Sequence, residues 1–266
     1  MNEQEIKALR EAQVVKSNEL IQKSRHNLTP LQFDLLTFVM TQIHTFDRAG
    51  QRYKLYIKDF CEVVGIDSRS GAYTRVKKAL DAIDKITVWI PKGNKEVRIR
   101  WFNILQMEEG SGEITLSFHE EIEPHLIGLT KNFTKYEAEQ SYALKSCKYS
   151  KYLFDFLVSN LNRGEITISL EDFNKYVCPN NYKEYRDINK WILQPALAEI
   201  NNITDITANY EPLKKNSRKT THLHFSIKAV KGFAEKLIRQ NNRTLVLDKE
   251  AAEYLAGGGE PDELPY

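Results

Sequence analysis

Two histidines near the end of the chain have the spacing of metal ligands. His222 and His224 flank one leucine in the segment NYEPLKKNSRKTTHLHF, residues 209–225. Side chains two positions apart on a strand point to the same face, so the two imidazoles could hold a catalytic metal ion. Four cations come directly before them, at Lys214, Lys215, Arg218 and Lys219. The segment therefore predicts either a nuclease or a basic hairpin tip that contacts nucleic acid.

A nicking enzyme of the rolling-circle type needs more than this histidine pair. It uses a tyrosine nucleophile, commonly on a helix with a lysine nearby, so that metal-bound phosphate faces the phenolate. Only Tyr254 and Tyr266 follow the histidines, AEYLAGGG around Tyr254 has no lysine on the following turn, and no third metal ligand is evident. We therefore expect no enzyme activity, no metal and no cofactor. We expect His222 and His224 to be exposed strand residues near a phosphate backbone.

Composition narrows the class of protein. The 266 residues suffice for one large domain or two small ones, and the 41% hydrophobic share gives material for real cores. The net charge of +2 does not by itself indicate a nucleic-acid partner, so the distribution of the cations matters more. No apolar run approaches the roughly 20 residues that cross a bilayer, and the N-terminus is polar. We expect a cytoplasmic protein with no membrane partner.

The sequence contains an internal repeat. YKLYIKDF at residues 53–60 and EITISLEDF at residues 165–173 each read as a short alternating strand that leads into an acid-Phe pair opening a helix. Residues 73–87 and 185–204 then read as helices that end at a β-branched strand, with an insertion around Pro195 in the second. The two units therefore share one order of elements.

An amphipathic helix precedes each unit and a hairpin follows it. The helices are predicted at residues 31–43, where Thr29-Pro30 would form the start, and at residues 151–161. Polar tips at residues 91–95 and 214–219 separate pairs of strands and fit hairpin reversals. The order helix, strand, helix, helix, hairpin thus occurs twice, and this is the order of a winged helix.

We predict an α+β fold of two tandem winged-helix domains related by this internal repeat. The predicted parts are residues 1–130 for the first domain, 131–150 for a short rigid connecting segment, 151–240 for the second domain and 241–266 for a partly disordered tail. A rigid connection would fix the spacing of the two modules on one duplex, which raises affinity through effective concentration.

The second helix of each pair has an apolar inward stripe. On a helical wheel the inward residues are Val76, Ala79, Leu80 and Ile83 in the first helix and Ile188, Trp191, Ile192 and Pro195 in the second. We assign the three tryptophans, Trp89, Trp101 and Trp191, to the core rather than to base stacking. The outward faces of both helices are rich in cations.

Those outward faces predict DNA recognition. Cations neutralise phosphates, and Arg or Asn near the start of a helix can also pair with base edges. A solvated charged face is the alternative, but two such helices, each followed by a basic hairpin, favour nucleic acid. The predicted DNA-binding residues are Thr74, Arg75, Lys78, Lys92, Lys95, Tyr182, Lys183, Arg186, Asn189, Lys190, Lys214, Lys215, Arg218 and Lys219.

Three segments together resemble the initiator (Rep) proteins of theta-replicating plasmids. They are VVKSNELIQKSRHNLTPLQFDLL at residues 14–36, ALKSCKYSKYLFDFL at residues 143–157 and YRDINKWILQPALAEINNITD at residues 185–205. Relatives usually have a continuous Lys-Ser-Lys-Tyr type junction, whereas Cys147 lies inside the junction of this chain. The resemblance covers nearly the whole sequence, from about residue 14 to residue 230.

The resemblance implies a function that residue spacing alone does not. It implies binding to repeated sites (iterons) of double-stranded DNA at a plasmid origin, opening of that origin, and recruitment of host replication proteins such as a helicase, its loader or an initiator. It also implies a homodimer in equilibrium with a monomer. The monomer would bind iterons, and the dimer, formed mainly through the first domain, would bind an operator and repress its own gene. A transcriptional repressor with no role in initiation and the metal-dependent nicking enzyme are the alternatives.

Overall fold

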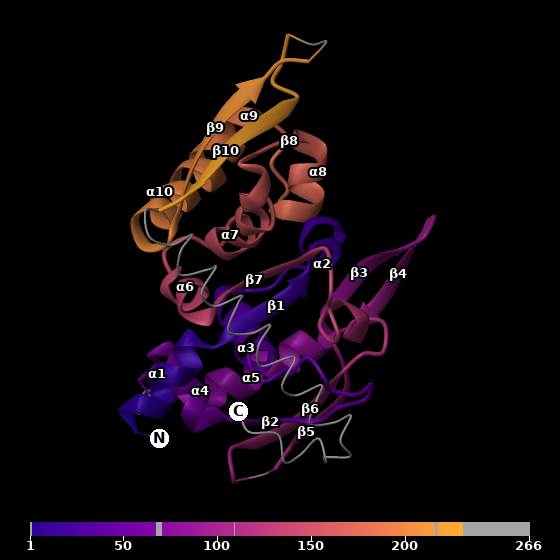
Figure 1. Cartoon of the computed structure of the whole chain (residues 1–266), viewed down its shortest axis with the longest axis vertical. Helices are drawn as coiled ribbons and strands as arrows, with labels where there is room; N and C mark the ends of the chain where they lie inside the picture. Colours follow the sequence, from indigo (N-terminus) through magenta and orange to yellow (C-terminus); the bar gives the residue numbers. More distant parts are fainter. Residues whose placement is uncertain (1, 68–70, 109, 216–217, 231–266) are drawn as a thin grey trace.

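The protein consists of two winged-helix halves arranged along the long axis of the molecule (Figure 1). The structure is a computed structural model that describes residues 2–67, 71–108, 110–215 and 218–230. The buried apolar side chains of both halves form one contiguous cluster, whereas each half keeps its own sheets. Within the described residues, no helix has the length and apolar character needed to span a bilayer.

The first half contains the helices of a helix-turn-helix and two hairpins. Its elements are α1 (Glu3–Glu11), β1 (Gln13–Ser17), α2 (Asn18–Lys23), α3 (Pro30–Met40), β2 (Tyr53–Tyr56), α4 (Ile57–Val64), α5 (Ala72–Lys85), β3 (Thr87–Lys92), β4 (Lys95–Arg100), β5 (Phe102–Met107), β6 (Glu113–Phe118) and the 3₁₀ turn η1 (Glu123–His125). The predicted start of α3 is confirmed. Thr29 caps it with a capping box to Gln32, and Pro30 takes the first helical position.

The first half is not an exact copy of the second, because it has an additional hairpin. Strand β2 pairs antiparallel with β6, which pairs with β5, while β3 and β4 form a separate two-stranded sheet. A bend at Trp101 separates β4 from β5. The internal repeat predicts that hairpin β3–β4 lies beside β2. Hairpin β5–β6 lies there instead, and the repeat does not predict this second hairpin.

The connecting segment is partly built into the first half. It contains β7 (Phe133–Glu137) and α6 (Ala138–Ala143). Strand β7 pairs antiparallel with β1, from Gln13 opposite Glu137 to Ser17 opposite Phe133. The segment thus supplies a strand and a helix in addition to a connection, and the predicted domain boundaries themselves stay a prediction.

The second half has the simpler winged-helix arrangement. Its elements are α7 (Ser150–Ser159), the 3₁₀ turn η2 (Leu161–Arg163), β8 (Glu165–Ser169), α8 (Leu170–Asp172), the π-helical turn η3 (Phe173–Val177), α9 (Tyr185–Ile188), the π-helical turn η4 (Asn189–Leu193), α10 (Gln194–Ile203), β9 (Ile206–Leu213) and β10 (His222–Ala229). Strand β10 lies between β8 and β9 in an antiparallel sheet. Its Phe225 packs against Phe173 and Phe156, and this contact joins the sheet to the helices.

The assignment of Trp191 to the core is wrong. Its side chain is 52% exposed, and the buried residues that follow Ile188 are Ile192 and Leu193. The π-helical turn η4 explains the difference, because a π-helical turn contains one more residue than an α-helical turn. The next inward positions after Ile188 are therefore Ile192 and Leu193 instead of Trp191. Trp101 is buried as predicted, and Trp89 is half-buried.

Candidate nucleic-acid interface

The predicted recognition helix of the second half begins with exposed cations. Helices α9, η4 and α10 follow one another without a break, and their buried apolar residues are Ile188, Ile192, Leu193, Ala196, Leu197 and Ile200. Tyr182, Lys183, Arg186 and Lys190 are exposed, as the sequence predicts for an outward face. The ammonium of Lys190 lies 4.5 Å from the ring centroid of Trp191, so this face presents a cation and an aromatic ring together.

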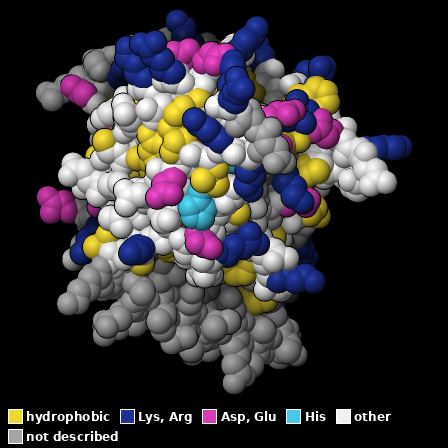
Figure 2. Space-filling view, turned by 90° about the horizontal axis from the view of Figure 1, so that it is seen from above, with side chains coloured by type: hydrophobic (Ala, Val, Ile, Leu, Met, Phe, Trp, Pro, Cys, Tyr) yellow, Lys and Arg dark blue, Asp and Glu magenta, His cyan; other side chains and the backbone are white. Residues whose placement is uncertain are grey.

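The basic hairpin tip of the second half lies beside this helix. Lys214, Lys215, Arg218 and Lys219 are all exposed. The ammonium of Lys219 lies 3.2 Å from a carboxylate oxygen of Glu184, the residue directly before α9. Figure 2 looks down on this end of the molecule and shows many Lys and Arg side chains there, with carboxylates among them. The structure thus brings the predicted wing and the start of the predicted recognition helix together.

Asn189 has a structural role in this helix. It is half-buried, and its side-chain oxygen accepts hydrogen bonds from the hydroxyls of Tyr210 and, at 3.5 Å, Tyr185. Burial and the neighbouring Tyr185 raise the pKa of Tyr210 to about 12, so the Tyr210 hydroxyl keeps its proton and donates. A bidentate contact with adenine would need the same oxygen as an acceptor. The predicted base contact of Asn189 competes with these bonds and stays a prediction.

The outward face of α5 in the first half is exposed as predicted. Val76, Ala79, Leu80 and Ile83 are buried. Thr74, Arg75 and Lys78 are exposed. The element next to the start of α5 is the tip of hairpin β5–β6, because a Cβ at Gly112 would lie 3.5 Å from the Tyr73 ring. This tip carries carboxylates at Glu108 and Glu113, of which Glu113 lies 2.9 Å from the ammonium of Lys54. Residues 107–113 contain no Lys or Arg, so the tip differs in charge from the basic wing of the second half.

Hairpin β3–β4, which carries Lys92 and Lys95, extends upward and outward from the first half (Figure 1). Lys92 pairs with Glu121, and Lys95 is exposed near the tip. Glu96 pairs with Arg25 and lies 3.6 Å from the ammonium of Lys175 in the second half. The hairpin and α5 meet at the hairpin's base, where Arg100 lies 3.6 Å from Asp84. The hairpin that follows the first predicted recognition helix thus meets that helix at its base and contacts the second half through Glu96.

The two histidines of the opening segment are half-buried, so the expectation that both are exposed is wrong. Nδ1 of His224 lies 2.9 Å from the Thr167 hydroxyl, and Nδ1 of His222 lies 2.9 Å from the Thr221 hydroxyl. Among the residues that the structure describes, no group of three His, Cys, Asp or Glu side chains has the geometry of a metal site. Tyr254 and Tyr266, the candidate nucleophiles of a nicking enzyme, lie outside the described residues.

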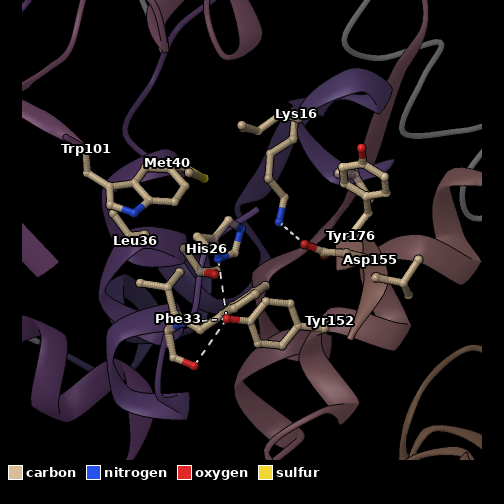
Figure 3. Close-up of a pocket in the computed structure, with 14 residues that line it drawn as sticks. Lys16, His26, Phe33, Leu36, Met40, Trp101, Tyr152, Asp155 and Tyr176 are labelled. Atoms are coloured by element: carbon tan, nitrogen blue, oxygen red, sulfur yellow. Dashed lines mark hydrogen bonds and ion pairs between the residues drawn. The ribbon is translucent and has the colours of Figure 1, made fainter. Parts of the chain in front are cut away.

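A small cavity between the halves is lined by aliphatic and aromatic side chains and by a few polar groups (Figure 3). Lys16 pairs with Asp155, and the Tyr152 hydroxyl lies 3.3 Å from Nδ1 of His26 and bonds both backbone groups of Leu28. The cavity volume is about 40 Å³, which admits little more than a water molecule. We therefore assign no ligand to this cavity.

Glu199 fixes α10 to the junction between the halves. Its carboxylate accepts hydrogen bonds from the backbone N–H groups of Lys145 and Ser146, both at 2.6 Å, and Cys147 at 3.1 Å, and from the Ser150 hydroxyl at 2.5 Å. Burial alone would raise the pKa of Glu199, but these hydrogen bonds outweigh it and hold the pKa below its usual value. One feature of the sequence could have indicated this role: Glu199 is a carboxylate on the buried apolar face of α10, three positions after Ala196.

Comparisons with known proteins agree with this architecture. Residues 13–158 match the family model described as "Initiator Replication protein, WH1", and residues 169–227 match "Initiator Rep protein, WH2". A "Replication initiation protein" of Escherichia coli is 28% identical over 228 residues, which cover 80% of this chain and 69% of that protein. Among solved structures, the chain is similar to the Pi initiator protein in a complex with iteron DNA. The TM-score is 0.67 at 18% identity, and the match covers 84% of this chain and 99% of that one.

The fold and the matches define a protein with two tandem winged-helix domains, as the sequence predicts. The chain belongs to the family of initiator replication proteins, because the model of the first domain alone matches more than half of it and the model of the second domain follows in order. The resemblance to plasmid initiators noted from three sequence segments is thereby confirmed.

Proposed function

We propose that the protein initiates plasmid replication by binding repeated sites, iterons, in double-stranded DNA at the origin. The observation that carries the proposal is the contact between the basic wing and the start of α9, where Lys219 pairs with Glu184 beside exposed Lys183 and Arg186. A winged helix places such a helix in the major groove and its wing on the neighbouring backbone. The similar Pi initiator was solved with iteron DNA, which supports the same ligand here.

The finer steps belong to the same proposal. Binding energy would bend and untwist the origin, which costs least at flexible or A·T-rich steps, and the opened DNA would receive host replication proteins. Residues 1–130 would bind DNA and also form the homodimer that represses the protein's own gene. Residues 151–240 would supply the principal DNA recognition when the monomer binds iterons. The chemistry needs neither a bound metal nor a nucleophile, so we propose no catalytic activity.

The test separates contacts to bases from contacts to phosphates. Replacing Arg186 and Lys190 with Ala should weaken binding to the specific duplex by about 1–3 kcal/mol for each base that either side chain reads. Neutralising Lys214, Lys215, Arg218 and Lys219 should lower affinity for all sequences and reduce the salt slope by about 0.9 for each phosphate contact. Band-shift titrations at several salt concentrations measure both effects. If neither variant changes binding, this surface does not contact DNA.

A second assay separates initiation from repression. The gene is supplied in trans to a plasmid that carries only its origin and the direct repeats beside it. An initiator sustains replication of that plasmid, whereas a repressor does not. Incubating supercoiled origin DNA with the protein and Mn²⁺ tests the remaining alternative, since a covalent 5'-tyrosyl product would identify a nicking enzyme.

A further inference from the structure

A groove of about 460 Å³ runs between the two halves, on the side where hairpin β3–β4 approaches the second half. One wall comes from the first half and includes Arg25, Asn27 and Trp89. The other includes Lys148 of the connecting segment and Lys175 and Asn181 of the second half. The lining contains no carboxylate among the described residues. Glu96 lies beside the groove and contacts both Arg25 and Lys175, so it offsets only part of the positive charge.

The second-half wall of the groove leads directly into the proposed DNA-binding helix. The side-chain amide of Asn174 donates to the backbone oxygen of Tyr182 at 3.2 Å, and the backbone N–H of Tyr182 donates to Asn180 at 2.8 Å. Asn180 in turn donates to Asn174 at 2.9 Å. These bonds fix the groove wall to the residue that precedes Lys183. A duplex that contacts Lys183 therefore has its backbone close to the mouth of the groove.

The side chains of the groove suit phosphates better than unstacked bases. The Trp89 ring already has the guanidinium of Arg25 at 4.8 Å and that of Arg98 at 5.8 Å, and the Tyr149 ring has the ammonium of Lys148 at 5.3 Å. Single-strand binding sites instead use uncovered aromatic faces on which bases stack. Lys148 and Lys175 are both exposed, and each reaches across the groove: Lys148 donates to Asn27 at 2.9 Å, and Lys175 approaches Glu96.

We propose that this groove, formed by both domains, binds the sugar–phosphate backbone of duplex DNA between the contacts of the two winged helices. The inference rests on the proposed function and assigns the first domain's contribution to hairpin β3–β4 and the groove, since the tip beside α5 is acidic. Lys148 and Lys175 supply phosphate contacts that carry no sequence information. They also make the affinity depend on the docked arrangement of the two halves.

The experiment compares two charge-matched double variants of the full chain. Lys148→Gln with Lys175→Gln removes two cations from the groove, whereas Lys7→Gln with Lys58→Gln removes two exposed cations from α1 and α4, which pack together away from it. The probe is a duplex selected by the wild-type protein from a random-sequence library, studied by salt-dependent titration and by phosphate ethylation interference. The groove variant should lower the salt slope by about 2, one unit for each phosphate contact. Ethylation of the phosphates between the two winged-helix contacts should no longer interfere with binding of the groove variant, whereas the contacts to bases should remain.

Several outcomes overturn the inference. A groove variant whose slope and interference pattern equal those of the Lys7/Lys58 variant shows that the groove does not contact duplex. Loss of affinity for a single-stranded oligonucleotide alone assigns the groove to single strands. Lys148→Arg with Lys175→Arg must restore the slope, because a defect that persists with the charge retained reflects folding. If the wild-type protein selects no duplex, both the proposed function and this inference fail. If the wild-type protein selects a duplex and the groove variant binds it as the wild type does, only this inference fails.

Discussion

Trp191 is the residue at which binding and stability separate most clearly. Its indole ring is 52% exposed on the predicted recognition helix of the second half, next to the ammonium of Lys190. Trp191→Ala should lower the free energy of unfolding by about 1–2 kcal/mol, because only half of the side chain is buried. It should weaken duplex binding roughly tenfold, because the ring can contact a thymine methyl group or a sugar. Urea denaturation and fluorescence anisotropy measure the two quantities.

The buried Trp101 supplies the comparison for that experiment. Its side chain is 2% exposed, so Trp101→Ala should cost about 3–5 kcal/mol of stability. Equal destabilisation by the two substitutions, or unchanged DNA binding by Trp191→Ala, would show that the Trp191 ring serves packing and does not contact DNA.

At the same scale, the sequence predicts most of the exposed cations but not the contacts of individual side chains. The inward stripe of α5, from Val76 to Ile83, follows the regular helical period and is buried as predicted. Trp191 departs from its predicted place because the π-helical turn at residues 189–193 changes the period locally. The competing bonds of Asn189 also depend on Tyr210, which only the folded sheet brings near.

At the scale of elements, α10 depends on Glu199 for its attachment to the junction. Glu199→Gln should destabilise the protein by about 2–3 kcal/mol, because an amide nitrogen would face several N–H donors and the hydrogen bonds to a charged group would disappear. The depressed pKa of Glu199 means that its contribution is present above the unfolded-state value of 4.5 and is lost as the pH falls through the folded-state pKa. Urea denaturation at pH 7 and at acidic pH measures both effects.

An exposed carboxylate is the control for this element. Glu171 lies on the surface of α8, so Glu171→Gln should leave stability nearly unchanged. A Glu199→Gln variant that is as stable as Glu171→Gln would show that the junction does not need the anion.

Local patterns predict the repeated elements, whereas long-range strand pairing escapes them. The order of β8, the helices and hairpin β9–β10 follows directly from alternation, helical period and turn residues. The pairing of β1 with β7 joins residues more than a hundred positions apart, and the pairing of β2 with β6 rather than β4 depends on the competition between two hairpins. The residues near β1 or β2 in the sequence do not show which distant strand each of them pairs with. The sequence therefore predicts the first half less completely than the second.

At the scale of the whole molecule, two buried ion pairs hold the halves together. Lys151 of α7 lies 2.7 Å from Asp34 of α3, and Asp155 of α7 pairs with Lys16 of β1. Removing one partner of such a pair leaves an uncompensated buried charge, which costs several kcal/mol. Helix α7 therefore belongs to the core of both halves, and the halves should unfold together.

His26 allows this coupling to be measured by pH. Burial, with a smaller effect of the Lys16 charge, lowers the pKa of His26 to about 3. Its contribution to stability is therefore present above the unfolded-state value of 6.5 and is lost as the pH falls toward 3, at about 1.4 kcal/mol for each pH unit. Asp34 acts in the opposite direction, because burial raises its pKa to about 6 and protonation stabilises the folded state as the pH falls from 6 to 3.8. Comparison of wild type with His26→Phe isolates the histidine from that carboxyl.

His26→Phe should fit, because the ring packs edge-on against Trp101 and the Tyr152 hydroxyl keeps its bonds to Leu28. Urea unfolding at about pH 7.5, 6 and 5 should show a single transition in both proteins, with a smaller loss of stability toward acid in the variant. The same substitution at His222, on the second half's sheet, tests whether loss of any imidazole has this effect. A pH dependence unchanged by His26→Phe, or separate unfolding transitions for the two halves in wild type, would contradict the coupling through this junction.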